Sequence, residues 1–166
     1  MLIAHLPSGY LLARAGRAKA AAFWAALLGS VAPDFDMIWF HLIDQGRVLH
    51  HEYWSHLPAF WGVLALIGLP LLRFAKRDWL RPVAFFFAGI FLHLILDTLV
   101  GGIIWGWPFD ERQYQLAVVP ARYGHWVINF MLHWSFLAEI AILLAAIWLG
   151  RRDLMRGRVA TARGAR

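Results

Sequence analysis

The sequence predicts an all-α membrane protein, a polytopic helical bundle with four long spans and a short N-terminal helix. Hydrophobic residues make up 61% of the 166 residues and charged residues make up 16%, whereas a typical soluble domain is about 45–50% apolar and about 25% charged. So few charges cannot cover so much apolar surface in water, which argues against a soluble enzyme. Cysteine is absent, so disulfides and thiolate metal sites are excluded.

The first expected element is a short helix in residues 2–13, which are mostly apolar but include His5. We expect this helix to descend from the outer side of the membrane, antiparallel to the next helix. It is too short to span, so its neighbours should shield it from lipid. A signal peptide cleaved after Ala32 is the alternative interpretation, and cleavage there would remove His5.

Four apolar runs predict the four spans, and they cover residues 20–32, 57–72, 82–109 and 126–149. A membrane-spanning helix needs ~20 mostly apolar residues, with a range of roughly 17–25. The third and fourth runs are long enough by themselves. The first and second runs must borrow flanking residues to reach this length.

The basic residues between the runs predict the orientation. Lysine and arginine number three before the first run, then one, four and two in the successive loops, and six after the last run. The positive-inside rule therefore places residues 14–19, residues 73–81 and the C-terminal tail in the cytoplasm, and the loops 33–56 and 108–125 outside. This pattern is typical of a multi-pass protein of the bacterial cytoplasmic (inner) membrane.

The chain is expected to divide into a membrane-embedded helical domain, residues 1–149, and a basic cytoplasmic tail, residues 150–166. The tail has six Arg, one Asp and no apolar period, so we expect it to be disordered and to lie against anionic lipid headgroups. It contains no nucleic-acid-binding motif, so membrane lipid is the expected partner and nucleic acid is not. The oligomeric state is left open.

Ionisable side chains inside membrane segments are costly and usually functional, and here they form four clusters. The clusters are His5; Asp34 and Asp36; His50, His51, Glu52 and His56; and His93 with Asp97. At ~1.5 Å per residue, all four clusters fall in the outer half of the bilayer. This convergence favours one shared site over separate roles as helix caps, a polar loop and a structural hydrogen-bonded pair. We interpret three further residues as structural or as hydrogen-bond partners of metal ligands: His125, His133 and Glu139.

The motifs stand in a recognisable order along the chain. They are His-x-x-x-Gly from His5, Pro-Asp-x-Asp around Asp34, His-x4-His ending at His56, and His-Leu-x-Leu-Asp ending at Asp97. This order, over roughly residues 1–110, resembles the YdjM-like family of bacterial membrane-bound proteins, which are described as metal-dependent hydrolases. The resemblance implies a metal site made of His5, Asp34, Asp36, His51, His56, His93 and Asp97.

One motif departs from the family pattern. The family sequence His-Arg-Gly-x-Thr-His is replaced here by His51-Glu52-Tyr53-Trp54-Ser55-His56. The arginine that could hold an anionic substrate is therefore missing, and Glu52 becomes a candidate for an extra ligand or a general base. The family is also distantly similar to all-helical zinc phospholipases C and related nucleases, in ligand type and fold class only.

We therefore expect a metal-dependent hydrolase at the outer membrane face that acts on a phosphoester of a lipid or another amphiphile. Imidazole and carboxylate ligands suit zinc best and manganese second, and their number allows one or two ions. Asp34 or Asp36 would position a metal-activated water, and Glu52 or Asp97 would act as base or as partner of a ligand histidine. A divalent-metal or proton transporter and a non-catalytic structural membrane protein are the alternatives.

Overall fold

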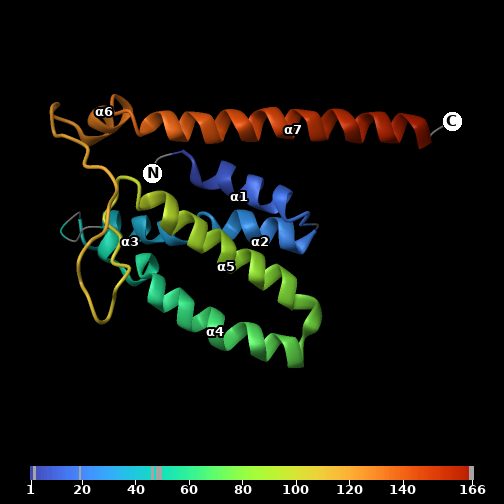
Figure 1. Cartoon of the computed structure of the whole chain (residues 1–166), viewed down its shortest axis with the longest axis horizontal. Helices are drawn as coiled ribbons and strands as arrows, with labels where there is room; N and C mark the ends of the chain where they lie inside the picture. The colour runs from blue at the N-terminus through green and yellow to red at the C-terminus, as the bar shows by residue number, and fades with distance from the viewer. Residues whose placement is uncertain (2, 19, 46, 48–49, 165–166) are drawn as a thin grey trace.

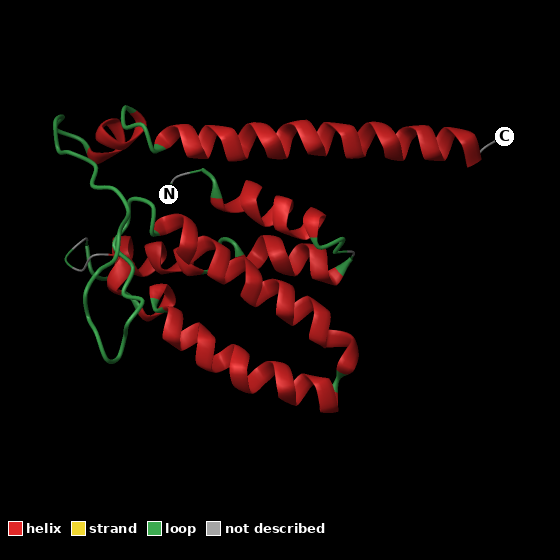
Figure 2. Cartoon of the chain, viewed as in Figure 1, coloured by secondary structure: helices red, strands yellow, loops and turns green. Residues whose placement is uncertain are grey.

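The computed structural model describes residues 1, 3–18, 20–45, 47 and 50–164, and these residues are mostly helical (Figures 1 and 2). The elements in chain order are α1 (His5–Ala15), α2 (Ala21–Gly29), the 3₁₀ turn η1 (Pro33–Phe35), α3 (Asp36–Leu42), the 3₁₀ turns η2 (His50–Glu52) and η3 (Trp54–His56), α4 (Pro58–Ala75), α5 (Arg77–Asp97), α6 (Trp126–Met131) and α7 (Phe136–Gly164). Helices α1, α2, α4 and α5 form a bundle, and α7 runs beside α1 (Figure 1). The all-α class predicted from the sequence is confirmed.

Helices α2 and α5 pack with their backbones in close approach, because glycines line their interface. A Cβ atom at Gly89 would lie 2.6 Å from the carbonyl oxygen of Ala26, and one at Gly29 would lie 2.0 Å from that of Phe86. Small residues allow this kind of approach between helices in membranes. The contact holds His93, one turn beyond Gly89, beside the end of α2.

Two described helices, α4 and α5, are long and apolar enough to cross a membrane. They have 18 and 21 residues, which matches the ~20 that a span requires. Helix α2 is long and apolar enough only when it is joined with residues Pro33–Leu42, which form η1 and α3. The two segments are bent by 57° relative to each other. The described part of the chain therefore has two candidate spans, or three if the bent pair is one span, and the expectation of four long spans is wrong.

The run predicted as the fourth span is interrupted in the structure. Helix α6 ends at Met131 and α7 begins only at Phe136. Between them, Nδ1 of His133 lies 2.8 Å from the Ser135 hydroxyl, and it also accepts a hydrogen bond from the Ser135 backbone N–H. Such local side-chain bonds compete with helix formation. The apolar part of α7, from Phe136 to Leu149, is about 20 Å long at ~1.5 Å per residue, shorter than a hydrocarbon core of ~30 Å.

The third apolar run also differs from its predicted extent. Helix α5 ends at Asp97 rather than continuing toward Phe109. Residues 98–125 instead form a loop with an isolated antiparallel bridge between Ile103 and Tyr114. This loop lies at the same end of the bundle as α3 (Figure 1), so its apolar residues extend over that end and do not lengthen the span.

Basic side chains gather at the opposite end of the bundle. Arg81, at the start of α5, donates hydrogen bonds of 3.1 and 2.9 Å to the carbonyl oxygens of Gly16 and Arg17 in the turn after α1. Nearby, Nε of Arg14 pairs with Asp153 of α7 at 2.8 Å. The fold thus separates the basic loops from the histidine and aspartate clusters along the length of the helices.

Helix α7 shows no break at the predicted boundary between the membrane domain and the tail. It continues from the apolar segment through Gly164. The tail was expected to be disordered from residue 150 onward, but it is helical up to Gly164. Whether it acts as a separate cytoplasmic unit stays a prediction.

Candidate metal centre

Five segments bring histidine and aspartate residues to one end of the bundle. Helix α1 begins at His5, η1 carries Asp34, α3 begins at Asp36, η3 ends at His56, and the last two turns of α5 carry His93 and Asp97. These residues stand at helix ends that meet at the same end of the fold (Figure 1). The common level that the sequence predicted for the four clusters corresponds to this meeting point.

The most deeply buried part of the cluster consists of His5, His93 and Asp97, whose side chains are 5%, 0% and 1% exposed. The Nε2 atom of His5 lies 3.2 Å from Asp97 Oδ1, and the Nε2 atom of His93 lies 2.9 Å from Asp97 Oδ2. The rings of His5 and His93 stack with their centroids 3.6 Å apart. The one-turn spacing of His93 and Asp97 places both side chains on the same face of α5.

Asp34 and His56 complete this group from the other side. The Nε2 atom of His56 lies 3.4 Å from Nε2 of His93 and 3.7 Å from Asp97 Oδ2. Asp34 Oδ1 lies 3.6 Å from Nε2 of His93 and 3.9 Å from Nε2 of His56. His56 is fully buried, whereas the Asp34 side chain is 35% exposed, so Asp34 forms the accessible edge of the group.

Hydrogen bonds on the far side of two rings determine which nitrogen faces the group. Nδ1 of His93 lies 2.9 Å from the backbone carbonyl oxygen of Ser30, and Nδ1 of His56 lies 2.7 Å from Asp36 Oδ2. A carbonyl oxygen and a carboxylate can only accept, so each Nδ1 carries the proton. Each Nε2 atom of a neutral ring is then left with a lone pair, the arrangement found for metal-binding histidines.

The cluster can therefore hold a metal ion. The Nε2 atoms of His56 and His93 each lie within 4 Å of an oxygen of Asp34 and of Asp97, and the Met1 ammonium pairs with Asp97 Oδ1, so the group attracts cations. Tetrahedral zinc ligands ~2.1 Å from the ion are roughly 3.4 Å apart, close to the 3.4 Å between the Nε2 atoms of His56 and His93. In addition, Nδ1 of His5 is buried without a hydrogen-bond partner among the described residues.

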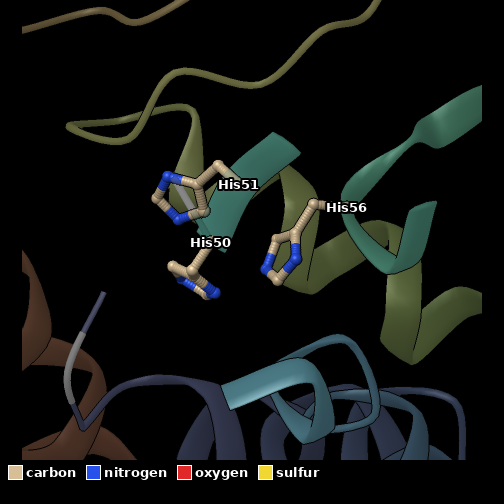
Figure 3. A group of neighbouring side chains, drawn as sticks. All are labelled: His50, His51 and His56. Atoms are coloured by element: carbon tan, nitrogen blue, oxygen red, sulfur yellow. The ribbon is translucent and has the colours of Figure 1, made fainter. Parts of the chain in front are cut away.

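His50 and His51 stand beside His56 in the segment between α3 and α4 (Figure 3). One ring nitrogen from each of these three histidines lies within 4.8 Å of the others. Nε2 of His51 is also 3.8 Å from Asp97 Oδ2. Burial lowers the pKa of His51 to about 3, against the opposing effect of the Asp97 charge. His51 is therefore a neutral imidazole at neutral pH, the form that binds metals.

Asp36 uses both of its carboxylate oxygens on neighbouring side chains. Oδ1 lies 3.1 Å from Nδ1 of His50, and Oδ2 accepts from Nδ1 of His56 and, at 2.5 Å, from the Ser55 hydroxyl. This geometry is typical of a carboxylate that orients ligand histidines. The role of Asp36 as a direct ligand stays a prediction.

Sequence reasoning missed two groups that support the cluster, the Ser30 carbonyl and the Ser55 hydroxyl. Ser55 occupies the position of the threonine in the family motif, next to His56, and that signal could have identified it. The Ser30 group is a backbone oxygen that any residue would supply. No sequence pattern marks it, and only the packing of α2 against α5 brings it to His93.

Two acidic residues lie outside the group. Glu52 is exposed, and its Oε1 atom accepts a hydrogen bond of 3.1 Å from Nε2 of Gln113 in the loop after α5. Its role as a base or ligand stays a prediction. Glu139 of α7 is fully buried, and its Oε2 atom accepts a hydrogen bond of 2.6 Å from the backbone N–H of Ile3. Glu139 thereby ties the segment that precedes His5 to α7.

Comparison with known proteins identifies one family. The model of the YdjM inner membrane protein family matches residues 1–157. The match contains every residue of the cluster and extends well beyond the four short motifs. No curated protein and no solved structure matches the chain significantly.

Proposed function

The chain belongs to the YdjM inner membrane protein family, and we propose that it is a metal-dependent hydrolase acting at the outer face of the inner membrane. The observation that carries this proposal is the convergence of His5, Asp34, His56, His93 and Asp97 at one end of the bundle. A buried set of imidazoles and carboxylates is the donor chemistry of hydrolytic zinc sites. The proposal names zinc as the first choice of metal and manganese as the second.

When bound, the metal would supply Lewis acidity and make a water molecule nucleophilic near neutral pH. The chain's own residues would divide the remaining work according to their burial. His5, His93 and Asp97 are shielded from solvent and would hold the ion. Asp34 is partly exposed and would orient the attacking water and accept its proton, since a general base must lie within hydrogen-bond reach of that water.

The surroundings of the cluster support an amphiphilic substrate. Phe35, Ile38 and Trp39 are exposed, and they flank Asp34 and Asp36 in the chain. Aromatic and aliphatic side chains of this kind favour the interface between lipid and water. A substrate with its tail in the bilayer could present its headgroup to Asp34. We propose a phosphoester of a lipid or another amphiphile, because phosphoester hydrolysis suits a zinc or manganese centre.

The orientation of the site is part of the same proposal. The basic turn after α1 and the start of α5 lie at the far end of the bundle from the cluster. Basic loops are retained in the cytoplasm, so the cluster would face the periplasm or the cell exterior.

The test uses the full chain purified in detergent, stripped with a chelator and reloaded with Zn²⁺ or Mn²⁺. Mixed lipids and lipid-linked phosphates are then assayed for released headgroup or phosphate. We expect metal-dependent release that is lost in the double variant Asp34→Ala/His56→Ala and kept in His41→Ala, which changes an exposed histidine of α3. Release that survives the double variant would overturn the proposal.

A further inference from the structure

We propose that His50, His51 and His56 hold a second metal ion, next to the ion that His5, His93 and Asp97 would hold. The second site rests on the proposed metal centre but not on the reaction assigned to it. It adds a ligand, His50, that the family motifs do not contain. Hydrogen bonds orient two of these histidines, and two carboxylates lie between them and the buried group.

The first observation is that one carboxylate orients two of the three rings. Asp36 Oδ1 lies 3.1 Å from Nδ1 of His50, and Asp36 Oδ2 lies 2.7 Å from Nδ1 of His56. Because an ionised carboxylate only accepts hydrogen bonds, it holds the proton of each neutral ring on Nδ1. The Nε2 atoms of both rings are then available to a metal. If His50 were only part of a polar loop, we would not expect it to share an orienting carboxylate with the buried His56.

The second observation is the grouping of the three rings. The ring centroids of His50 and His51 are 4.2 Å apart, those of His50 and His56 are 4.5 Å apart, and those of His51 and His56 are 5.1 Å apart. Figure 3 shows the three imidazoles around a common space. Three histidines are a known ligand set for zinc, which keeps its fourth position for water or substrate.

The third observation concerns depth. The side chains of His50 and His51 are each 23% exposed, whereas those of His93 and Asp97 are 0% and 1% exposed. Two of the three histidines therefore lie nearer to the solvent than the buried group, whereas His56 is itself fully buried. An ion held by the three would lie on the solvent side of the buried ion.

The fourth observation is that two carboxylates face both groups. Asp97 Oδ1 lies 3.2 Å from His5 Nε2, while its Oδ2 lies 3.7 Å from His56 Nε2 and 3.8 Å from His51 Nε2. Asp34 Oδ2 lies 4.0 Å from His5 Nε2, while its Oδ1 lies 3.9 Å from His56 Nε2. Asp97 Oδ2 also lies 2.9 Å from His93 Nε2, and Asp34 Oδ1 also lies 3.6 Å from it, so both carboxylates lie between the buried ligands and the trio. Carboxylates that bridge two ions show this pattern, and paired ions about 3.5–4 Å apart are common in phosphoester hydrolases.

The test counts ions directly. Purified protein is stripped, reloaded with Mn²⁺ or Zn²⁺ and dialysed, and the metal content per chain is measured by mass spectrometry. We expect two ions per chain in the wild type, one in His50→Ala, and two in the matched control His41→Ala. The single ion retained by His50→Ala also shows that this variant folds. Manganese-loaded samples provide a second readout, because two adjacent Mn²⁺ ions give an exchange-coupled paramagnetic resonance spectrum and one ion does not.

Each result decides the question separately from hydrolysis. One ion per chain in the wild type would overturn the second site, even if the protein hydrolyses phosphoesters. Two ions in both the wild type and His50→Ala would also overturn it. Two ions in the wild type and one in His50→Ala would establish it, even if no substrate were cleaved and the proposed function failed.

Discussion

Asp36 Oδ2 lies 2.7 Å from Nδ1 of His56, and this contact decides which nitrogen of the histidine faces the cluster. The carboxylate accepts the Nδ1 proton, so the lone pair of Nε2 points toward His93, 3.4 Å away. The two residues come from different elements, the start of α3 and the end of η3. The bend between α2 and α3 therefore places the carboxylate that orients His56.

The first prediction follows from this contact. Asp36→Asn replaces an acceptor-only carboxylate with an amide that offers one acceptor and one donor, so His50 and His56 cannot both keep the proton on Nδ1. Loss of such an orienting partner typically lowers metal affinity about 10–100-fold, and we expect a change of that size in competition titrations with a chelating dye. Asp44→Asn is the control, because Asp44 accepts from the Tyr53 hydroxyl outside the cluster. Equal affinity in Asp36→Asn and the wild type would contradict the orienting role.

The second prediction concerns the close approach of α2 and α5. Gly89→Ala places a methyl group 2.6 Å from the Ala26 carbonyl oxygen, and the two helices must separate to accept it. Overpacking of this kind costs about 1–3 kcal/mol, which we expect to see as a lower free energy of unfolding in detergent. Gly68→Ala in α4 meets no atom within 4 Å and should leave that free energy unchanged or slightly raised. Equal stability of the two variants would be inconsistent with the described interface.

The third prediction separates the two ions. A Cβ atom at Gly101 would lie 2.3 Å from Cε1 of His51, so Gly101→Ala should push the His51 ring away from its neighbours. We expect metal analysis to find one ion per chain instead of two, with the buried ion retained. Gly124→Ala, which meets no atom within 4 Å, serves as the control and should keep both ions. Two ions in Gly101→Ala would mean that His51 is not needed for the second site.

The fourth prediction concerns sidedness, and the absence of cysteine makes it simple to test. Single cysteines are introduced as Glu52→Cys, near the cluster, and Lys76→Cys, in the turn between α4 and α5. We expect a membrane-impermeant thiol reagent applied to intact spheroplasts to label Glu52→Cys only. Lys76→Cys should react after lysis. The reverse pattern would place the cluster on the cytoplasmic side.

The sequence predicted the all-α class and helices α4 and α5 because long apolar runs interrupted by basic turns are unambiguous signals. It also identified five candidates, because ionisable side chains are rare in membrane segments and are usually functional there. These are His5, Asp34, His56, His93 and Asp97. Their arrangement within the cluster was not predictable, because it depends on close packing that joins α1, α2 and α5.

The errors have equally specific causes. The run in residues 126–149 is mostly apolar, yet side-chain bonds of His133 and Ser135 interrupt the helix, and composition does not reveal such local competition. Residues 98–109 are also mostly apolar, yet they form a loop at the end of the bundle, and apolarity alone cannot distinguish a loop in a membrane protein from the end of a span. The Ser30 carbonyl was missed because a backbone atom has no sequence signature.

The central claim is that His5, Asp34, His56, His93 and Asp97 form a metal centre. X-ray absorption spectroscopy at the zinc edge of the reloaded, dialysed protein tests it most directly. We expect bound zinc with nitrogen and oxygen neighbours at ~2.0–2.1 Å and the outer-shell scattering of imidazole rings, with a weaker imidazole signal in His93→Ala. Wild-type protein that retains no zinc after dialysis, or zinc whose spectrum lacks imidazole scattering, would contradict it.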